Sequence, residues 1–198
     1  MTESASLFFV VRRAIEDLGA VRARAALVGG LAVGVHALER ATRDADFVVA
    51  VGSDAEAERI TADLVARGYR LALALEHIDA GRLATIRLVS PLDGRTMVDL
   101  LFASSGIEPE IVATAESMDI GAGIICPVAR RGHLIALKIL ARSDRRPQDD
   151  QDLGALLDGA DDDELARARV ALALVSERGF ARGKDLAAEF DEQVGRWR

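Results

Sequence analysis

The sequence has little cysteine: Cys126 is the single one among its 198 residues, whereas many small secreted proteins are held together by disulfide bonds. One cysteine excludes an intramolecular disulfide, which fits a reducing cytoplasm. Cys126 lies in an apolar run without a nearby histidine, so we interpret it as a small buried side chain and not as a reactive thiol. Aromatic residues make up only 4% of the chain while 50% of it is hydrophobic, so Leu, Val, Ile and Ala must fill the core.

Long apolar runs and an excess of basic charge are also absent. No apolar run approaches the roughly 20 residues that a membrane helix needs. No basic segment precedes the first apolar stretch, so we expect no signal peptide and a soluble, cytoplasmic protein. The formal net charge is −7, so the chain lacks the excess of basic residues expected for an extended nucleic-acid-binding surface. A local basic patch is still compatible with this charge.

The hydrophobic periodicity changes near residue 129. Before it, strand patterns alternate with helical ones, and after it the pattern is helical only. We expect strands at 25–28, 46–51, 69–75, 83–89, 96–102 and 124–128, and helices at 4–19, 31–38, 55–67, 133–142, 149–157, 161–178 and 184–194. The turn at 91–94 predicts a hairpin between 83–89 and 96–102. The sequence therefore predicts an α/β fold: a mixed β-sheet flanked by helices at 1–129, and a C-terminal helical bundle at 130–198 packed on it.

Two glycines, Gly29 and Gly30, come directly after the short apolar run 25–28 and precede a helical pattern. Glycines at such a junction let the backbone approach a ligand closely. A helix N-terminus also presents free N–H groups that suit a phosphate. Paired glycines occur in many turns, so this feature indicates a phosphate site only in combination with metal-binding residues nearby in the chain.

Two aspartates, Asp44 and Asp46, open the strand predicted at 46–51. Side chains at i and i+2 of a strand share a face, so both carboxylates point the same way. Hard oxygen ligands at this spacing suit Mg²⁺ or Mn²⁺. Asp99 lies between apolar neighbours in a later strand and supplies a third carboxylate if the two strands are adjacent. The alternative is that these acids are solvated loop residues, or, for Asp99, a structural hydrogen-bond partner.

The arrangement of Val28-Gly29-Gly30, a gap at 31–43 and Asp44-Ala45-Asp46 resembles the signature of polymerase-β-like nucleotidyltransferases. More narrowly, with Arg40 and Thr42, it resembles the AbiEii/AbiGii-type toxins of type IV toxin–antitoxin systems. A second block supports the resemblance: the segment 134–142 is similar to that family's lysine helix, and 145–153 to the basic turn and Asp-x-x-Asp after it. The matching blocks span roughly residues 25–157.

The resemblance implies transfer of a nucleoside monophosphate from an NTP with Mg²⁺ or Mn²⁺ as cofactor. Gly29 and Gly30 would hold the triphosphate, and Asp44 and Asp46 would bind metal. Lys138 would contact the NTP phosphates. The alternative for Lys138 is a surface lysine on an amphipathic helix.

An aspartate of the segment 149–152 would be the last motif residue. Asp149 and Asp152 share a helix face, so the sequence does not separate them, and Asp150 is the weaker candidate.

Some positions depart from the family pattern or have two interpretations. Ala45 stands where a branched aliphatic residue is common, and Ala37 where glycine is common, which puts the substrate in doubt more than the chemistry. We interpret His36 as structural, packing its helix against the loop of Arg40. Arg40 and Arg43 orient the acids, touch substrate, or are plain surface charge.

Three functions are compatible with these patterns. The first is a toxin-like nucleotidyltransferase that acts on RNA, such as tRNA, and is restrained by a cognate antitoxin; the basic segments 130–131 and 142–146 would contact phosphate, although the net charge argues against RNA. The second is the same chemistry on a small molecule, as in antibiotic-modifying enzymes. The third is a non-catalytic binding protein with the same fold, which ranks lowest because all acidic motif positions are present.

Overall fold

The computed structural model of this chain describes residues 3–37, 42–78, 80–142 and 147–198. Arg40, the end of the helix predicted at 31–38, and residues 143–146 of the second basic segment therefore lie outside the described residues. Among the described residues, no helix is both long enough and apolar enough to cross a membrane.

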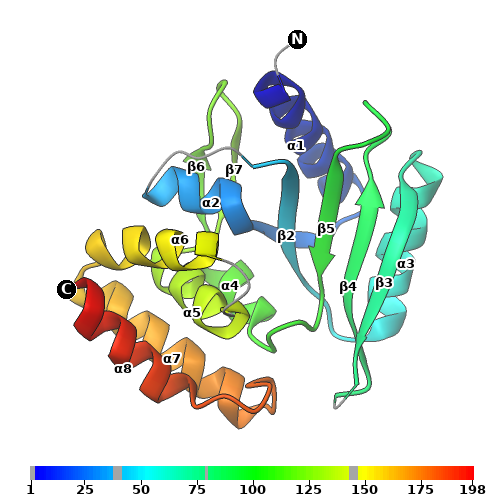
Figure 1. Ribbon diagram of the computed structural model, residues 1–198. Coiled ribbons are helices and arrows are strands. Elements are labelled where there is room, and N and C mark those ends of the chain that lie inside the picture. Colours follow the sequence, from blue (N-terminus) through cyan, green and yellow to red (C-terminus); the bar gives the residue numbers. More distant parts are fainter. Residues whose placement is uncertain (1–2, 38–41, 79, 143–146) are drawn as a thin grey trace.

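A seven-stranded mixed sheet forms the centre of the protein, in the strand order β3-β4-β5-β2-β1-β7-β6 (Figure 1). The central pair β2 and β5 is parallel, as is β1 with β7, and the other neighbours are antiparallel. The strands are β1 (Arg24–Val28), β2 (Asp44–Ala50), β3 (Arg70–His77), β4 (Arg82–Val89), β5 (Met97–Leu101), β6 (Glu116–Asp119) and β7 (Ile125–Val128). The predicted hairpin is confirmed as β4 and β5.

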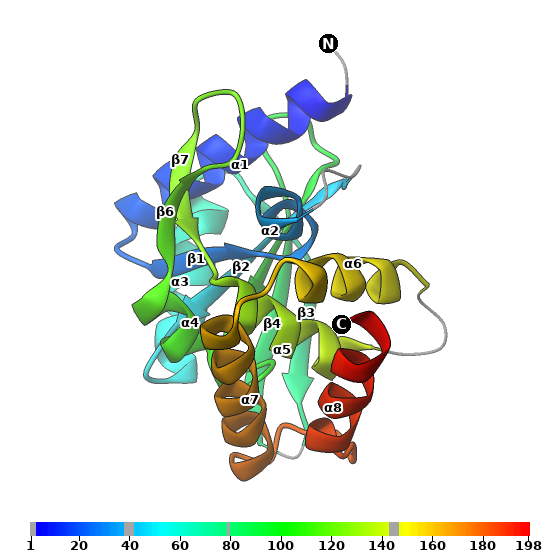
Figure 2. The same ribbon diagram turned by 90° about the vertical axis from the view of Figure 1, so that its left-hand side faces the viewer.

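Helices cover the sheet from both sides (Figure 2). Helices α1 and α3 lie on one side, and α5, α6 and α8 gather on the other, where α5 contacts α6, α7 and α8. The helices are α1 (Glu3–Ala20), α2 (Gly29–His36), α3 (Asp54–Ala66), α4 (Glu108–Thr114), α5 (Arg131–Ala141), α6 (Pro147–Asp158), α7 (Asp162–Glu177) and α8 (Leu186–Trp197). The α/β fold with a mixed sheet and a helical C-terminal region is therefore confirmed.

Local chemistry explains several of these boundaries. Ser53 caps α3, since its side chain accepts a hydrogen bond from the backbone N–H of Glu56. Gly68 then takes a φ of +99°, which ends that helix before β3. Asp161 caps α7 in the same way, with the N–H of Glu164 as donor. Cys126 is 2% exposed, and burial raises its pKa to about 11, so its interpretation as a buried side chain is confirmed.

Two elements, α4 and β6, were not predicted from the sequence, and both lie after Gly106. Helix α4 has only seven residues, and its signals are Pro109 in the first turn and the acids Glu108 and Glu110 beside it. Strand β6 alternates between half-buried and exposed residues and carries little hydrophobic pattern. The strand β7 also continues through Pro127 instead of ending there, because β7 meets β1 only at Val128. Proline is tolerated where a strand has no partner on one side.

Candidate active site

Gly29 begins helix α2 directly after β1, and its position allows no other residue. Its φ is +66°, a left-handed conformation that favours glycine. A Cβ at this position would lie 2.0 Å from Oδ2 of Asp46. The N-cap residue Val28 provides no side-chain hydrogen bond, so within the described part of the chain the first N–H groups of α2, including that of Gly30, are not capped by a side chain. The turn predicted at Gly29 and Gly30 is thus the start of helix α2, and it packs directly against Asp46.

A row of charged side chains crosses the sheet beside this helix start. Asp46 of β2 lies opposite Asp99 of β5, and Asp99 lies opposite Arg87 of β4. Residues opposite each other in a sheet project from the same face, and Asp44 shares that face because it lies two residues before Asp46. The sheet therefore brings all three predicted acids together, as the sequence reasoning required.

Arg87 binds Asp99 with both arms of its guanidinium, and sequence reasoning missed it. Nε donates to Oδ1 at 2.8 Å and Nη2 donates to Oδ2 at 2.6 Å. This contact raises the pKa of Arg87, mainly through the hydrogen bond to Asp99. The signal was present, because the hairpin register of β4 and β5 places Arg87 opposite Asp99 and both are charged residues between apolar neighbours.

Asp44 and Asp46 differ from Asp99, since within the described part of the chain neither forms a hydrogen bond or ion pair through its carboxylate. Burial raises the pKa of Asp46 to about 6, and the charges of Asp99 and Asp44 add to that effect. Burial likewise raises the pKa of Asp44. The two carboxylates are therefore crowded and short of positive charge.

The donor chemistry of this pair fits a divalent cation. Carboxylate oxygens are the ligands that Mg²⁺ and Mn²⁺ prefer, and a cation between Asp44 and Asp46 would relieve their repulsion. No group of three acidic, histidine or cysteine side chains in the described ranges is arranged to hold a metal. Asp99 is bound by Arg87 in this structure, so the fit rests on Asp44 and Asp46.

Lys138 faces the acids from helix α5, and it is held by two carboxylates of α6. Its Nζ donates to Asp149 Oδ1 at 2.8 Å and to Asp152 Oδ2 at 2.7 Å. Its side chain is only 13% exposed, so it is not a surface lysine. Asp149 and Asp152 do share one helix face, and Asp150 points elsewhere, since it pairs with Arg142 at 2.7 Å.

Asp149 and Asp152 occupy different places around this lysine. Asp149 lines the same cleft as Asp44 and Asp46, and its Oδ2 is buried without a hydrogen-bond partner in the described part of the chain. Asp152 is not among the residues that line the cleft, and it also contacts the side chain of Gln148 at 3.4 Å. Of these two acids, Asp149 is therefore the one that lines the cleft.

This cleft has a volume of about 590 Å³, and both halves of the chain line it. This volume is in the range of small-molecule sites. The polar and glycine residues in its wall are Gly29, Gly30, Thr42, Asp44, Asp46, Arg87, Asp99, Ser104, Ser105, Lys138, Asp149 and Arg182. Of these, sequence reasoning missed Arg87, Ser104, Ser105 and Arg182 as site residues.

The loop after β5 is fixed by a buried carboxylate, that of Glu108 at the start of α4. Glu108 is 1% exposed. Its Oε1 accepts hydrogen bonds from the backbone N–H and the hydroxyl of both Ser104 and Ser105, at 2.7 to 3.2 Å. The loop therefore forms a rigid wall of the cleft.

Other polar residues named by the sequence have structural partners. The Nε2–H of His36 donates a hydrogen bond to the backbone O of Ala129 at 2.8 Å, so it ties α2 to the end of β7. Arg131 donates to the backbone O of His36 and of Leu156. Arg130 pairs with Glu116 and Glu164 at 2.9 and 3.6 Å. Arg43 is exposed, and its charge lowers the pKa of Asp44 against the effect of burial.

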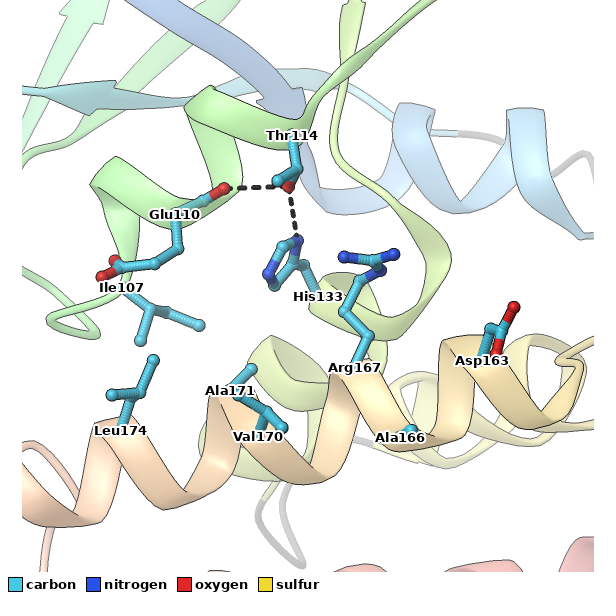
Figure 3. Close-up of a pocket in the computed structure, with 10 residues that line it drawn as sticks. All are labelled: Ile107, Glu110, Thr114, His133, Asp163, Ala166, Arg167, Val170, Ala171 and Leu174. Carbon is cyan, nitrogen blue, oxygen red and sulfur yellow. Dashed lines mark hydrogen bonds between the residues drawn. The ribbon is translucent and has the colours of Figure 1, made fainter.

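A second cavity, of about 430 Å³, lies between α4, α5 and α7 (Figure 3). Burial lowers the pKa of His133 to about 4, so this imidazole is neutral at pH 7. Thr114 lies between His133 and the backbone O of Glu110, to which its hydroxyl donates at 2.9 Å. The carboxylate of Glu110 is paired with Arg178 at 2.6 Å. The neutral His133 and the paired Glu110 distinguish this cavity from the cleft that Asp44 and Asp46 line.

Comparison of the sequence with protein-family models found no match, and comparison with curated proteins found none. Solved structures are similar in fold. An antigenic nucleotidyltransferase-like protein from Paracoccidioides brasiliensis has a TM-score of 0.51 at 20% identity, covering 92% of this chain and 91% of that one. ANT(2'')-Ia in complex with adenylyl-2''-tobramycin gives 0.49 at 13% identity and 100% of both chains. A nucleotidyltransferase candidate from H. pylori gives 0.45 at 16%, covering 98% and 93%. The chain thus has the mixed α/β fold of a nucleotidyltransferase-like protein.

Proposed function

We propose that this protein is a metal-dependent nucleotidyltransferase, which moves a nucleoside monophosphate from an NTP to a hydroxyl group of an acceptor. The observation that carries the proposal is a pair of carboxylates without a partner among the described residues, Asp44 and Asp46, of which Asp46 packs against the start of helix α2 at Gly29. A cation site beside a phosphate site is what an NTP with its metal requires.

Each wall of the cleft has a part in this reaction. The N–H groups at Gly29 and Gly30 bind phosphate oxygens, and the positive end of α2 favours the anion. Asp44 and Asp46 would hold Mg²⁺ or Mn²⁺, which would neutralise these acids and withdraw charge from the triphosphate. Lys138 adds a positive charge that the NTP phosphates reach from the side of α5.

The acceptor hydroxyl attacks the α-phosphorus of the NTP. A bond forms between the acceptor oxygen and that phosphorus, the bond to the bridging oxygen breaks, and pyrophosphate leaves. We assign the hydroxyl proton to Asp149, because this residue lines the cleft and its Oδ2 has no hydrogen-bond partner among the described residues. Asp152 then acts through Lys138, which it positions.

Arg87 has a supporting part in the same site. It binds both oxygens of Asp99 and so keeps this carboxylate turned toward β4. Its charge also lowers the pKa of Asp46 against the effect of burial, which favours the ionised form that a cation needs. Asp44 and Asp46 would therefore be the residues that hold the metal, and Asp99 lies opposite Asp46 in the sheet.

For the acceptor we propose RNA, such as tRNA, as the resemblance to AbiEii-type toxins implies, with a cognate antitoxin as protein partner. A specific observation favours the second candidate, a small hydroxyl compound. Arg130, Arg131 and Arg142, which would contact RNA phosphate, form ion pairs or hydrogen bonds within the protein.

One experiment tests the activity and separates the acceptors. The protein is incubated with each α-labelled NTP, Mg²⁺ and total tRNA, and in parallel with a panel of small polyhydroxyl compounds that includes aminoglycosides. Label on RNA supports the toxin-type enzyme, and label on a small compound supports the second candidate. Absence of NTP binding in the presence of metal contradicts both and leaves the non-catalytic binding protein.

A further inference from the structure

Arg182 brings a positive charge to the cleft from the segment between α7 and α8, which no sequence motif covers. In Figure 1 this orange-red segment runs beside the loop after β5. Arg182 has a φ of +56°, and Gly183 after it has a φ of +76°. A left-handed arginine is uncommon, and such strain persists only where the surroundings hold it.

The surroundings of Arg182 hold it at two points. Its Nη2 donates to the backbone O of Ser104 at 2.9 Å, and Ser104 is itself fixed by Glu108. Two residues earlier, Phe180 is 8% exposed and packs on Gly106, where a Cβ would lie 2.5 Å from its ring. The ring of Phe180 also lies 4.6 Å from that of His77 on β3. The guanidinium is therefore placed before any ligand arrives.

Arg182 differs in its ion pairing from the other two cationic side chains in the cleft wall. Arg87 is bound by Asp99, and Lys138 by Asp149 and Asp152. Arg182 forms no ion pair with the residues that the structure describes. It remains accessible to solvent, but burial against its neighbours lowers its pKa, partly offset by the charge of Glu108. A guanidinium stays charged nevertheless, so it gains most from an anion.

We propose that Arg182 binds a phosphate group of the NTP, so that the C-terminal helical region completes the nucleotide site. This assignment rests on the proposed function, because it takes an NTP as the ligand of the cleft. A phosphate of an RNA acceptor has the same chemistry. We choose the NTP because Arg182 lines the cleft together with Gly29 and Lys138, whereas residues that track an RNA backbone lie along an outer surface.

Two substitutions at this position test the assignment. The affinity for each NTP with Mg²⁺ is measured by isothermal titration calorimetry in the absence of acceptor. Arg182→Gln should weaken binding by about ten- to a hundredfold, the usual effect of losing a hydrogen bond to a charged group. Arg182→Gly should weaken binding to the same extent and leave Tm equal to or above that of the wild type, because glycine accepts the left-handed backbone. A merely structural arginine would lower Tm in both variants and leave the NTP affinity unchanged.

Arg178 provides the matched control, since it anchors the same segment without lining the cleft. It donates to the backbone O of Gly106 and pairs with Glu110. Arg178→Gln should lower Tm and change NTP affinity by less than about twofold. If the wild type binds the NTP and Arg182→Gln binds it with the same affinity, the assignment of Arg182 is wrong while the proposed function stands. The same holds if the variant loses affinity only for an RNA oligonucleotide. No NTP binding by the wild type would overturn the proposed function together with it.

Discussion

Two walls of the cleft both carry carboxylates, but the carboxylates differ in whether they are paired with a cation. The sheet wall (Asp44 and Asp46) holds carboxylates without a partner in the described residues. In the helix wall (Lys138 and Asp149), the lysine ammonium group is shared between Asp149 and Asp152, which lies outside the cleft lining. Pairing stabilises the helix wall without a ligand. In the proposed function, a cation would offset the charge of the sheet wall. The difference indicates that the helix wall is ordered by its own ion pairs, whereas the sheet wall depends on a ligand for its neutralisation.

The largest expected effect comes from the sheet wall. Asp46→Asn keeps the shape of the side chain and removes a metal ligand, so the transfer rate should fall by at least about a thousandfold, since metal stabilisation is worth several kcal/mol. Transfer of label from an NTP measures it. Asp63→Asn, which affects the exposed pair with Arg59, serves as control and should retain full activity. An active Asp46→Asn enzyme would contradict the metal assignment.

The helix wall should respond in stability. Lys138→Met leaves Asp149 and Asp152 without their shared cation, and removing one partner of a buried pair costs about 3–5 kcal/mol. Urea unfolding at pH 7 measures this loss. Arg142→Met breaks the more exposed pair with Asp150 and should cost less than about 1 kcal/mol. Equal losses in the two variants would show that the helix wall is not a supporting element.

The pH dependence of the sheet wall sharpens the contrast. The pKa of Asp46 is raised to about 6 from 3.8, so the folded protein binds more protons than the unfolded chain between these values. Without metal, this residue should make stability fall as pH rises from about 4 to 6, by up to about 3 kcal/mol. Denaturation of wild type and Asp46→Asn in a chelator measures it. Asp46→Asn should lack this pH-dependent fall in stability. In the wild type, added Mg²⁺ should reverse the fall above pH 6.

The smallest expected effect concerns Arg87, which couples Asp99 to the sheet wall. Its side chain is 40% exposed, so losing the ion pair in Arg87→Gln should cost only about 1 kcal/mol of stability. The freed Asp99 adds a third carboxylate, and Mn²⁺ affinity measured by calorimetry should rise by about fivefold, the equivalent of about 1 kcal/mol. Weaker Mn²⁺ binding would show instead that Arg87 holds Asp99 in a ligand position.

The sequence was most informative where local pattern decides structure. Gly29 and the pair Asp44 and Asp46 lie at element boundaries that hydrophobic periodicity reveals, and the spacing of Asp149 and Asp152 on a helix predicts their shared face. Their convergence on Lys138 is tertiary, but the resemblance named all three residues. These groups, with the mixed sheet and the helical region, could be anticipated before the structure.

What the sequence could not show depends on register and on loop packing. Arg87 joins the site because three adjacent strands align at one level, which no single strand pattern specifies. Arg182 joins it because Glu108 fixes a loop, and α4 that carries Glu108 is too short to show periodicity. The division at residue 129 into a core and a helical region stays a prediction.

The contribution of Arg182 to the cleft has a consequence for the timing of synthesis. Gly29 leaves the ribosome early, whereas the residues that complete the cleft emerge later, in the order Arg87, Lys138, Asp149 and Arg182. A nascent chain released before Arg182 carries the acids of the sheet wall but not the full set of cations. The cleft is therefore complete only after Arg182 has been synthesised, and a chain that terminates before this residue has an incomplete cleft.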